Sequence, residues 1–401
     1  MLALILGAIF YTASLDSPAW KKFYKVAPMI LLCYFVPSVL PMTGIVSLEE
    51  SKLYDVAKGY LLPAALILLT ISIDIPAIIG LGPKALIMFL TGTLGVVIGG
   101  PIAILLVSAV APEWLQTGDG EAWRGLATVA GSWIGGGANQ VAMKEMFNPS
   151  GDLFTTMVTV DVLVAEFWML FLLLGVDRAD AIDRFLKADS SSIEALKQKM
   201  VDLAEKRNRI PSSVDFMVML AIAFGGTGVC KWFASHLATW IQNEAPQLAK
   251  FSLDSSLFWL VVLSTTLGVG LSFTRVKHYE GAGASKIATV FIFILVATIG
   301  LKMDILAIRK HLGLFSVGLI WMIIHVGLMF AVAKLIRAPY FFLAVGSKAN
   351  IGGAASAPVV AAAFHPSLTP VAVLLSVLGY ALGTYLAYLC AIGMQWASGA
   401  M

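Results

Sequence analysis

The sequence predicts an all-α membrane protein with about 11–13 transmembrane helices in two repeats, which we expect to be inverted, with a discontinuous helix in each. Apolar residues make up 59% of the 401 residues and charged residues only 13%, whereas a soluble domain carries about 25% charge. Mean hydropathy is +0.88. A glycine-rich apolar segment also occurs twice, once in each half of the chain. Interrupted apolar segments at corresponding places point to the binding site of a transporter.

Long apolar runs predict the membrane helices in chain order. The opening run, Leu2–Leu15, is shorter than the roughly 20 residues needed to cross a bilayer. We therefore expect a spanning helix that is truncated at its front, or an interfacial segment. The further predicted helices lie near residues 24–44, 59–79, 84–110, 122–147, 151–175, 214–241, 256–274, 285–303, 309–336, 338–364 and 368–396.

One charged stretch separates the two halves. Residues 177–212 contain eight Lys or Arg and seven Asp or Glu, and the sequence SSIEALKQKMVDLAEKRNRI has helical periodicity. We expect a solvent-exposed amphipathic linker there. The chain then divides into a first membrane repeat, 1–176, with its break near 131–147, and a second, 213–401, with its break near 346–364.

The duplicated segment carries the repeat. The first copy is GSWIGGGANQVAMKEMFNPS, Gly131–Ser150, and the second is GSKANIGGAASAPVVAAAFHPS, Gly346–Ser367. With a shift of 217 positions, seven of 17 residues are identical, including the Pro-Ser exit. Upstream, LILLTISIDI and ILVATIGLKMDI both close on Asp-Ile, at Asp74 and Asp304. Glycine-rich helices also serve close packing alone, but packing does not require matching polar residues and exits.

A break in a membrane helix frees backbone groups that persist only inside protein or beside water. Freed carbonyls can coordinate a cation, and the N-terminus of a half-helix can hold an anion. The alternative for the polar residues is a role as hydrogen-bonding contacts between helices. The residues that we predict to bind substrate are Gly135, Gly136, Gly137, Asn139, Gln140, Asn350, Gly352, Gly353 and Ser356.

Three acidic residues are candidates for ion coupling. Asp161 and Glu166 lie in the apolar segment after the first break, where ionisable groups are costly and usually functional. We assign Asp161 a cation or proton role, and expect a Na⁺ site, if one exists, at Asp161 and Asn139. A satisfied interhelical hydrogen bond is the alternative. Asp74 is a weaker candidate that could instead cap its helix.

Three further polar features have open interpretations. Lys348, at the second break, serves either as a built-in cation that attracts an anionic substrate or as a side chain that reaches to water. Lys144 and Glu145 are expected to form an interfacial pair, and His325 to be a hydrogen-bonded core histidine.

Other function classes have little support. The net charge of +3 gives no reason to expect a nucleic acid partner. The three cysteines lie in apolar runs, so they do not suggest a disulfide or metal framework. The sequence lacks HExxH, GxSxG and P-loop motifs, and we expect neither an enzyme nor a cofactor, only Na⁺ or H⁺ as a coupling ion.

The segments GSWIGGGANQVAMKE and GSKANIGGAASAP, with the opening WKKFYKVAPMILLCYFVPSVLP, resemble the YjcL-like family of uncharacterised bacterial integral membrane permeases. The resemblance covers nearly the whole chain. It implies kinship in fold with cation/proton antiporters and with sodium symporters for bile acids or glutamate. It also implies crossing discontinuous helices, a scaffold domain, elevator-type alternating access, a homodimer and a place in the bacterial inner membrane. The antiporters have paired acids, whereas Asp161 has no neighbouring Asp.

These observations together predict a secondary active transporter, in which Na⁺ or H⁺ drives transport of a small organic anion. Its expected partners are that substrate, the lipid bilayer and a second copy of the chain. A monovalent cation/proton antiporter is the first alternative, and a non-transporting membrane scaffold the second. A scaffold would have no need of costly buried acids.

Overall fold

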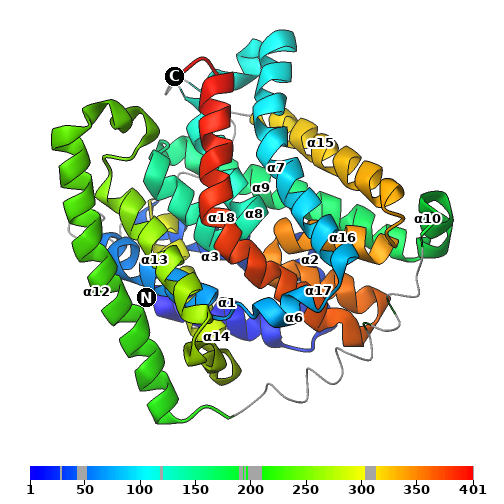
Figure 1. Cartoon of the computed structure of the whole chain (residues 1–401), viewed down its shortest axis with the longest axis horizontal. Coiled ribbons are helices and arrows are strands. Elements are labelled where there is room, and N and C mark those ends of the chain that lie inside the picture. Colours follow the sequence, from blue (N-terminus) through cyan, green and yellow to red (C-terminus); the bar gives the residue numbers. More distant parts are fainter. Residues whose placement is uncertain are drawn as a thin grey trace.

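The computed structural model describes residues 1–27, 29–42, 52–117, 121–188, 193, 196, 210–302 and 313–400. Within these residues every regular element is a helix (Figure 1), which confirms the predicted all-α class. The longer helices form two groups by their mutual contacts, and each group draws helices from both halves of the sequence.

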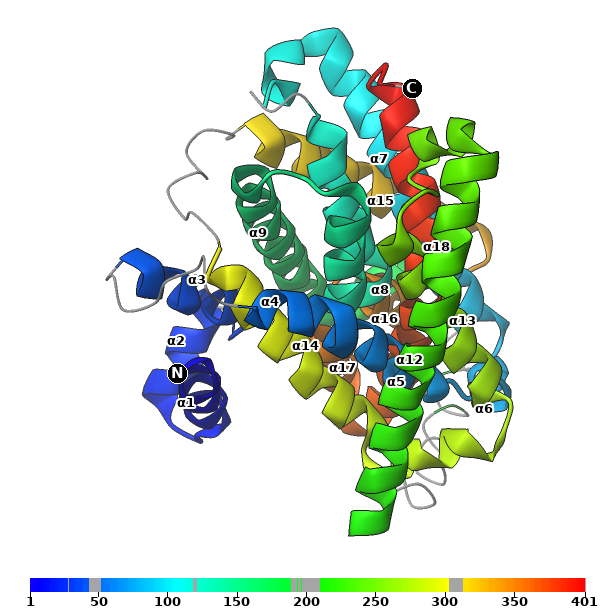
Figure 2. The same ribbon diagram turned by 90° about the vertical axis from the view of Figure 1, so that its left-hand side faces the viewer.

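The first set, which we call the flanking group, packs around α5 and α14. Its outermost member, α12, runs along one edge of the molecule (Figure 1) and lies in front of the other helices when that side faces the viewer (Figure 2). Large apolar side chains cover the outer surface of α12, such as Trp232 and Trp240, which are 57% and 58% exposed. Such a surface suits lipid. The group comprises α1 (Leu2–Ser14), α3 (Met29–Met42), α4 (Leu53–Val56), η1 (Ala57–Leu61), α5 (Leu62–Ile71), α12 (Ser213–Glu244), α13 (Ser256–Ser272) and α14 (Ala284–Gly300).

The second set, the core group, holds both glycine-rich segments. Its central element, α18, contacts α7, α8, α16 and α17. The group comprises α7 (Pro83–Val110), α8 (Ala122–Phe147), α9 (Gly151–Val176), α15 (Gly313–Leu335), α16 (Tyr340–Asn350), α17 (Gly353–Phe364) and α18 (Thr369–Ala397). Short helices complete the chain, among them α2 (Pro18–Val26), α6 (Ile75–Ile79) and α10 (Ala179–Leu186).

The number of long spans is lower than the count of apolar runs suggests. Among the described residues six helices are long and apolar enough to cross a membrane, or up to eight if each bent pair is one span. Several predicted spans are shorter apolar helices of 10–17 residues, such as Ala284–Gly300 and Gly353–Phe364. The opening segment is short as expected, because the chain bends by 116° between α1 and the following helix.

Local sequence explains where the site-bearing helices begin and end. The Ser150 hydroxyl accepts from the Leu153 N–H and caps α9, and Ser212 with Asp215 forms a capping box at the start of α12. Asn148, in the left-handed conformation, ends α8. In the first repeat the Pro-Ser exit therefore separates α8 from α9, whereas in the second Pro366–Leu368 forms a short 3-10 helix between α17 and α18.

Element order matches between the two halves. In each, a long helix (α7 or α15) precedes a broken segment, and a final long helix follows it (α9 or α18). That the two repeats are inverted stays a prediction. The linker begins with α10, whereas most of its predicted amphipathic helix lies outside the described residues, as does Asp304.

Candidate functional site

Both glycine-rich segments are broken helices. In α8 the helix is interrupted at Gly136, whose φ of 69° and ψ of −172° are open to glycine and strained for other residues. In the second half, α16 ends at Asn350 and α17 begins at Gly353, with positive φ at Gly352 (104°) and Gly353 (56°). The backbone groups freed at each break lie within the core group, where protein can satisfy them.

Helix α18 brings the two breaks together. A Cβ placed on Gly379 would lie 2.8 Å from the Ile134 carbonyl oxygen before the first break and 3.7 Å from the Ala349 oxygen before the second. The ring of Tyr380 lies 3.4 Å from the corresponding position on Gly136 and 4.0 Å from that on Gly353. One glycine and one tyrosine of α18 therefore touch both interruptions.

Asn139 ties the first break to α18. Its amide nitrogen donates to the carbonyl of Gly135, across the break, at 3.0 Å and to the carbonyl of Tyr380 at 3.2 Å. Its amide oxygen accepts from the Thr384 hydroxyl at 2.7 Å. The same hydroxyl lies 3.0 Å from that of Thr265 on α13, so the network extends into the flanking group.

Asn350 ties the second break to α7 by the same arrangement. Its amide nitrogen donates to the carbonyls of Gly346 and Phe89, each at 2.9 Å. Its amide oxygen accepts from the Thr93 hydroxyl at 2.7 Å. In both cases the asparagine amide nitrogen donates to the backbone carbonyl four residues before it. The amide group also bonds a backbone carbonyl and a threonine hydroxyl on a neighbouring helix, and those two residues are again four positions apart.

Asp161 is buried against the first break. The Trp133 indole N–H donates to one carboxylate oxygen at 2.7 Å, and the Gln140 amide donates to the other at 2.8 Å. Asp161 is 6% exposed. Tyr34, from α3, donates to the Gln140 amide oxygen at 3.4 Å. Neutral donors thus orient a carboxylate in the interior, where its charge is costly unless it is compensated.

Lys348 is fully buried near the second break. Its ammonium donates to the Ala165 carbonyl of α9 at 2.9 Å, and the charges of both Glu166 and Asp161 act on it. The Lys348 side chain therefore does not reach to water. It places a positive charge between the break and the helix that carries Asp161.

Ser356 faces the same break from α17. A Cβ built on Gly352 would collide with the Ser356 hydroxyl oxygen and lie 3.3 Å from the Lys348 ammonium nitrogen. The Ser356 oxygen is buried and has no hydrogen-bond partner among the described residues. The start of α17 therefore gathers an ammonium, a hydroxyl and a helix N-terminus, which are the groups that bind an anion.

His325 belongs to a neighbouring buried network. Its ring nitrogens lie 3.1 Å from the Gly92 carbonyl oxygen and 2.7 Å from the Ser347 hydroxyl, and the Trp168 indole donates to that hydroxyl at 2.9 Å. This is the hydrogen-bonded core histidine that the sequence predicts. It fixes α15 and α9 to α16, directly before the second break.

The structure separates the predicted site residues. Gln140 and Asp161 meet at the first break, whereas the Asn139 amide bonds to α18 instead of Asp161. Glu166 is exposed on α9. Asp74 caps α6, with Lys277 at 3.8 Å. The predicted residues that lie at the breaks are Gly135, Gly136, Gly137, Asn139, Gln140, Asn350, Gly352, Gly353 and Ser356.

Sequence reasoning missed Tyr380, Thr384 and Thr93. A signal for them exists, because FLTGT at 89–93 and YALGT at 380–384 both have an aromatic residue three positions before a Gly-Thr pair. The glycine of this pattern allows close contact with the broken segment, because a Cβ on Gly383 would lie 2.6 Å from the Cα of Gly135. The threonine that follows each glycine donates a hydrogen bond to the asparagine of the broken segment.

The described residues include no group of three or more His, Cys, Asp or Glu side chains that could hold a metal ion. Cys33, Cys230 and Cys390 are buried and free. The polar groups around the two breaks are therefore one carboxylate, one ammonium, hydroxyls, amides and freed backbone groups. The carboxylate at the first break suits an alkali cation or a proton, and the ammonium at the second break suits a small anion.

Comparison with known proteins gives two matches. The model of a family described as "Protein of unknown function (DUF819)" matches residues 1–396. The chain is also 24% identical over 349 residues to the uncharacterized membrane protein YjcL of Bacillus subtilis (strain 168), an alignment that covers 84% of this chain and 82% of the relative. Together with the apolar helices, these matches make the chain an integral membrane protein.

Proposed function

The chain belongs to the DUF819 family of proteins of unknown function, and we propose that it is a secondary active transporter in which Na⁺ or H⁺ drives the movement of a small organic anion. One observation carries the proposal: two broken helices meet at Tyr380 with Asp161 and Lys348 buried beside them. Charges and interrupted helices at membrane depth are costly and mark substrate and ion pathways.

The two halves of the site have different chemistry. Asp161, with the amide of Gln140 and the backbone of the first break, is the proposed cation or proton site. Lys348, the Ser356 hydroxyl and the N-terminus of α17 are the proposed site for a carboxylate. Tyr380 lies between them and contacts both breaks.

Charge balance gives a reason for coupling. With the site empty, the buried charges of Asp161 and Lys348 offset each other, while Glu166, whose charge also acts on Lys348, is exposed. An anionic substrate at Lys348 would leave one uncompensated negative charge, which is unfavourable at low dielectric. A cation or proton at Asp161 removes that excess, so each ligand favours binding of the other.

The arrangement of helices supports an elevator-type mechanism. Both breaks belong to the core group, and the flanking group contacts it mainly through α5 and α13, which pack against α8 and α18. Movement of the core group as one body would carry both breaks from one face of the membrane to the other with the hydrogen bonds inside the core group intact. It would break the hydrogen bonds of Tyr34 and Thr265, which come from the flanking group.

Uptake into vesicles tests the proposal. We would reconstitute the native chain, impose a Na⁺ or a pH gradient, and measure uptake of a panel of labelled mono- and dicarboxylates. Asp161→Asn should abolish gradient-driven uptake, whereas Asp74→Asn, at the cap of α6, should retain it. Exchange of Na⁺ or K⁺ for H⁺ without any carboxylate would indicate the antiporter instead. Flux that is equal in native and empty vesicles would refute transport.

A further inference from the structure

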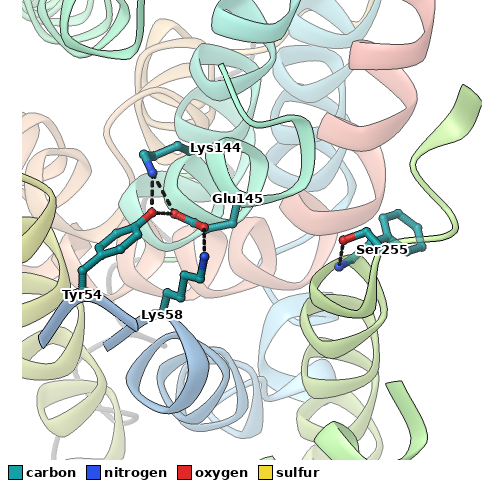
Figure 3. Close-up of polar contacts among 6 residues, drawn as sticks. Tyr54, Lys58, Lys144, Glu145 and Ser255 are labelled. Atoms are coloured by element: carbon teal, nitrogen blue, oxygen red, sulfur yellow. Dashed lines mark hydrogen bonds and ion pairs between the residues drawn. The ribbon is translucent and has the colours of Figure 1, made fainter. Parts of the chain in front are cut away.

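Three lysines converge on one tyrosine ring away from the breaks. The ammonium nitrogens of Lys302, Lys144 and Lys58 lie 4.2, 4.8 and 5.3 Å from the centre of the Tyr54 ring. Figure 3 shows Lys144 and Lys58 approaching the Tyr54 and Glu145 side chains from opposite sides. Cations near an aromatic face are attracted by it, but like charges so close together repel one another.

The carboxylates present do not balance the three lysines. Glu145 pairs with Lys144 at 2.8 Å and with Lys58 at 3.5 Å, and it also accepts a hydrogen bond from the Tyr54 hydroxyl. Asp55, which is exposed, is the other carboxylate among the described residues whose charge acts on Tyr54. Within the part of the chain that the structure describes, three ammonium groups thus face two carboxylates, which leaves a surplus positive charge.

The cluster is partly enclosed and still open to ligands. The side chains of Glu145 and Lys144 are 5% and 17% exposed, whereas that of Lys58 is 34% exposed and Lys302 is exposed. The ammonium groups of Lys58 and Lys302 are thus accessible from the surface, whereas Lys144 and Glu145 beneath them are already paired. An anion could contact Lys58 and Lys302 while Glu145 stays on Lys144.

The cluster also joins the two helix groups. Tyr54 and Lys58 come from α4 and η1, and Lys302 follows α14, all in the flanking group. Lys144 and Glu145 lie in the last turn of α8, in the core group. A ligand that neutralises the surplus charge therefore stabilises the present contact between the two groups.

We propose that Lys58, Lys144 and Lys302 form a binding site for an anionic phosphate or carboxylate group, separate from the site at the breaks. Ammonium groups bind such oxygens as point charges, and hydrogen bonds to charged groups are the stronger ones. Either a free anion or the headgroup of an anionic lipid carries this chemistry. Occupancy holds the core and flanking groups in the arrangement seen here.

Thermal unfolding of the full-length chain in neutral detergent tests the site. Sodium phosphate is titrated against sodium chloride at matched ionic strength, and phosphatidylglycerol against phosphatidylcholine in mixed micelles. The native chain should show a saturable rise in Tm. Lys58→Gln/Lys302→Gln should need at least about tenfold more ligand, because charge-assisted contacts are lost. Lys334→Gln, an exposed lysine over the Phe185 ring, should behave as native.

Each outcome decides the proposal. A response to phosphate assigns a free anion, and a response to phosphatidylglycerol alone assigns a lipid headgroup; both support the site if the double variant loses them. No response in the native chain, or an equal response in the double variant, overturns it. Because Lys302 is exposed, the single variant Lys302→Gln, with a weaker but measurable loss of affinity, serves if the double variant unfolds. None of these readouts depends on transport.

Discussion

The hydrogen bonds between Asn139 and Thr384 and between Asn350 and Thr93 lead to a prediction whose magnitude follows from the structure. Thr384→Val and Thr93→Val each remove the hydroxyl that donates to an asparagine amide oxygen at 2.7 Å, with almost no change in shape. Thr91→Val is the matched control, because the Thr91 hydroxyl donates to the Ile87 carbonyl of its own helix and to no other group among the described residues.

The expected loss follows from the acceptors left behind. A buried acceptor without its partner costs about 1–3 kcal/mol in soluble proteins, while interhelical hydrogen bonds in membranes average about 0.6 kcal/mol. We expect Thr93→Val to lower the free energy of unfolding by about 1 kcal/mol. Thr384→Val should cost more, because its hydroxyl also contacts that of Thr265 at 3.0 Å.

Reversible unfolding in mixed detergent micelles measures these differences, and double variants with Asn139→Ala or Asn350→Ala isolate the pairwise coupling. A coupling energy should be found for Thr384 with Asn139 and for Thr93 with Asn350, and should be absent for the crossed pairs. Equal stability of all three threonine variants, or an equal coupling energy in the crossed pairs, would show that these hydrogen bonds do not stabilise the broken helices.

Three further predictions follow from individual sites. Gly135→Ala should reduce folded yield sharply, because its Cβ would lie 2.8 Å from a Cα of α18, whereas Gly137→Ala meets nothing within 4 Å and should express as native. Lys348→Met should lower thermal stability, because it leaves the buried Asp161 carboxylate without the ammonium that offsets its charge, and it should lose uptake of anions; unchanged uptake would contradict its role. Burial raises the pKa of Asp183, which accepts from the Tyr340 N–H at 2.7 Å. A raised acid pKa contributes stability at low pH that is lost as pH rises through the folded value, so Asp183→Asn should flatten that decline in a pH series of unfolding curves.

Much of the site was accessible from sequence because its signals are local. The matched Ile-Gly-Gly runs and Pro-Ser exits identify both broken segments, since positive φ favours glycine and proline is unfavourable in a helix interior. Asp161 is conspicuous as an acid in an apolar segment. The buried polar role of Gln140 follows once the first break is placed.

The site residues that the sequence did not reveal depend on which helices pack against one another. Tyr380 and Thr384 lie more than 200 residues from Asn139 in sequence, and no periodicity links α18 to α8. Both helices are apolar over most of their length, so the pattern does not reveal which face of α18 lies against the breaks. For the same reason the partner of Asn139 could not be predicted, because its side chain could have faced either Asp161 or α18. The burial of Lys348 could not be predicted either, because its long side chain could equally have reached to water.

The most direct measurement of the central claim is thermal stability across Na⁺, K⁺ and pH series for the native chain, Asp161→Asn and the control Asp74→Asn. A cation at 100 times its dissociation constant stabilises the folded state by about 2.7 kcal/mol. The account predicts a Na⁺-specific or pH-dependent rise in the native chain and in Asp74→Asn that disappears in Asp161→Asn. A native chain that responds to none of these ions, or an Asp161→Asn variant that responds as native, would contradict the assignment of Asp161 as the coupling site.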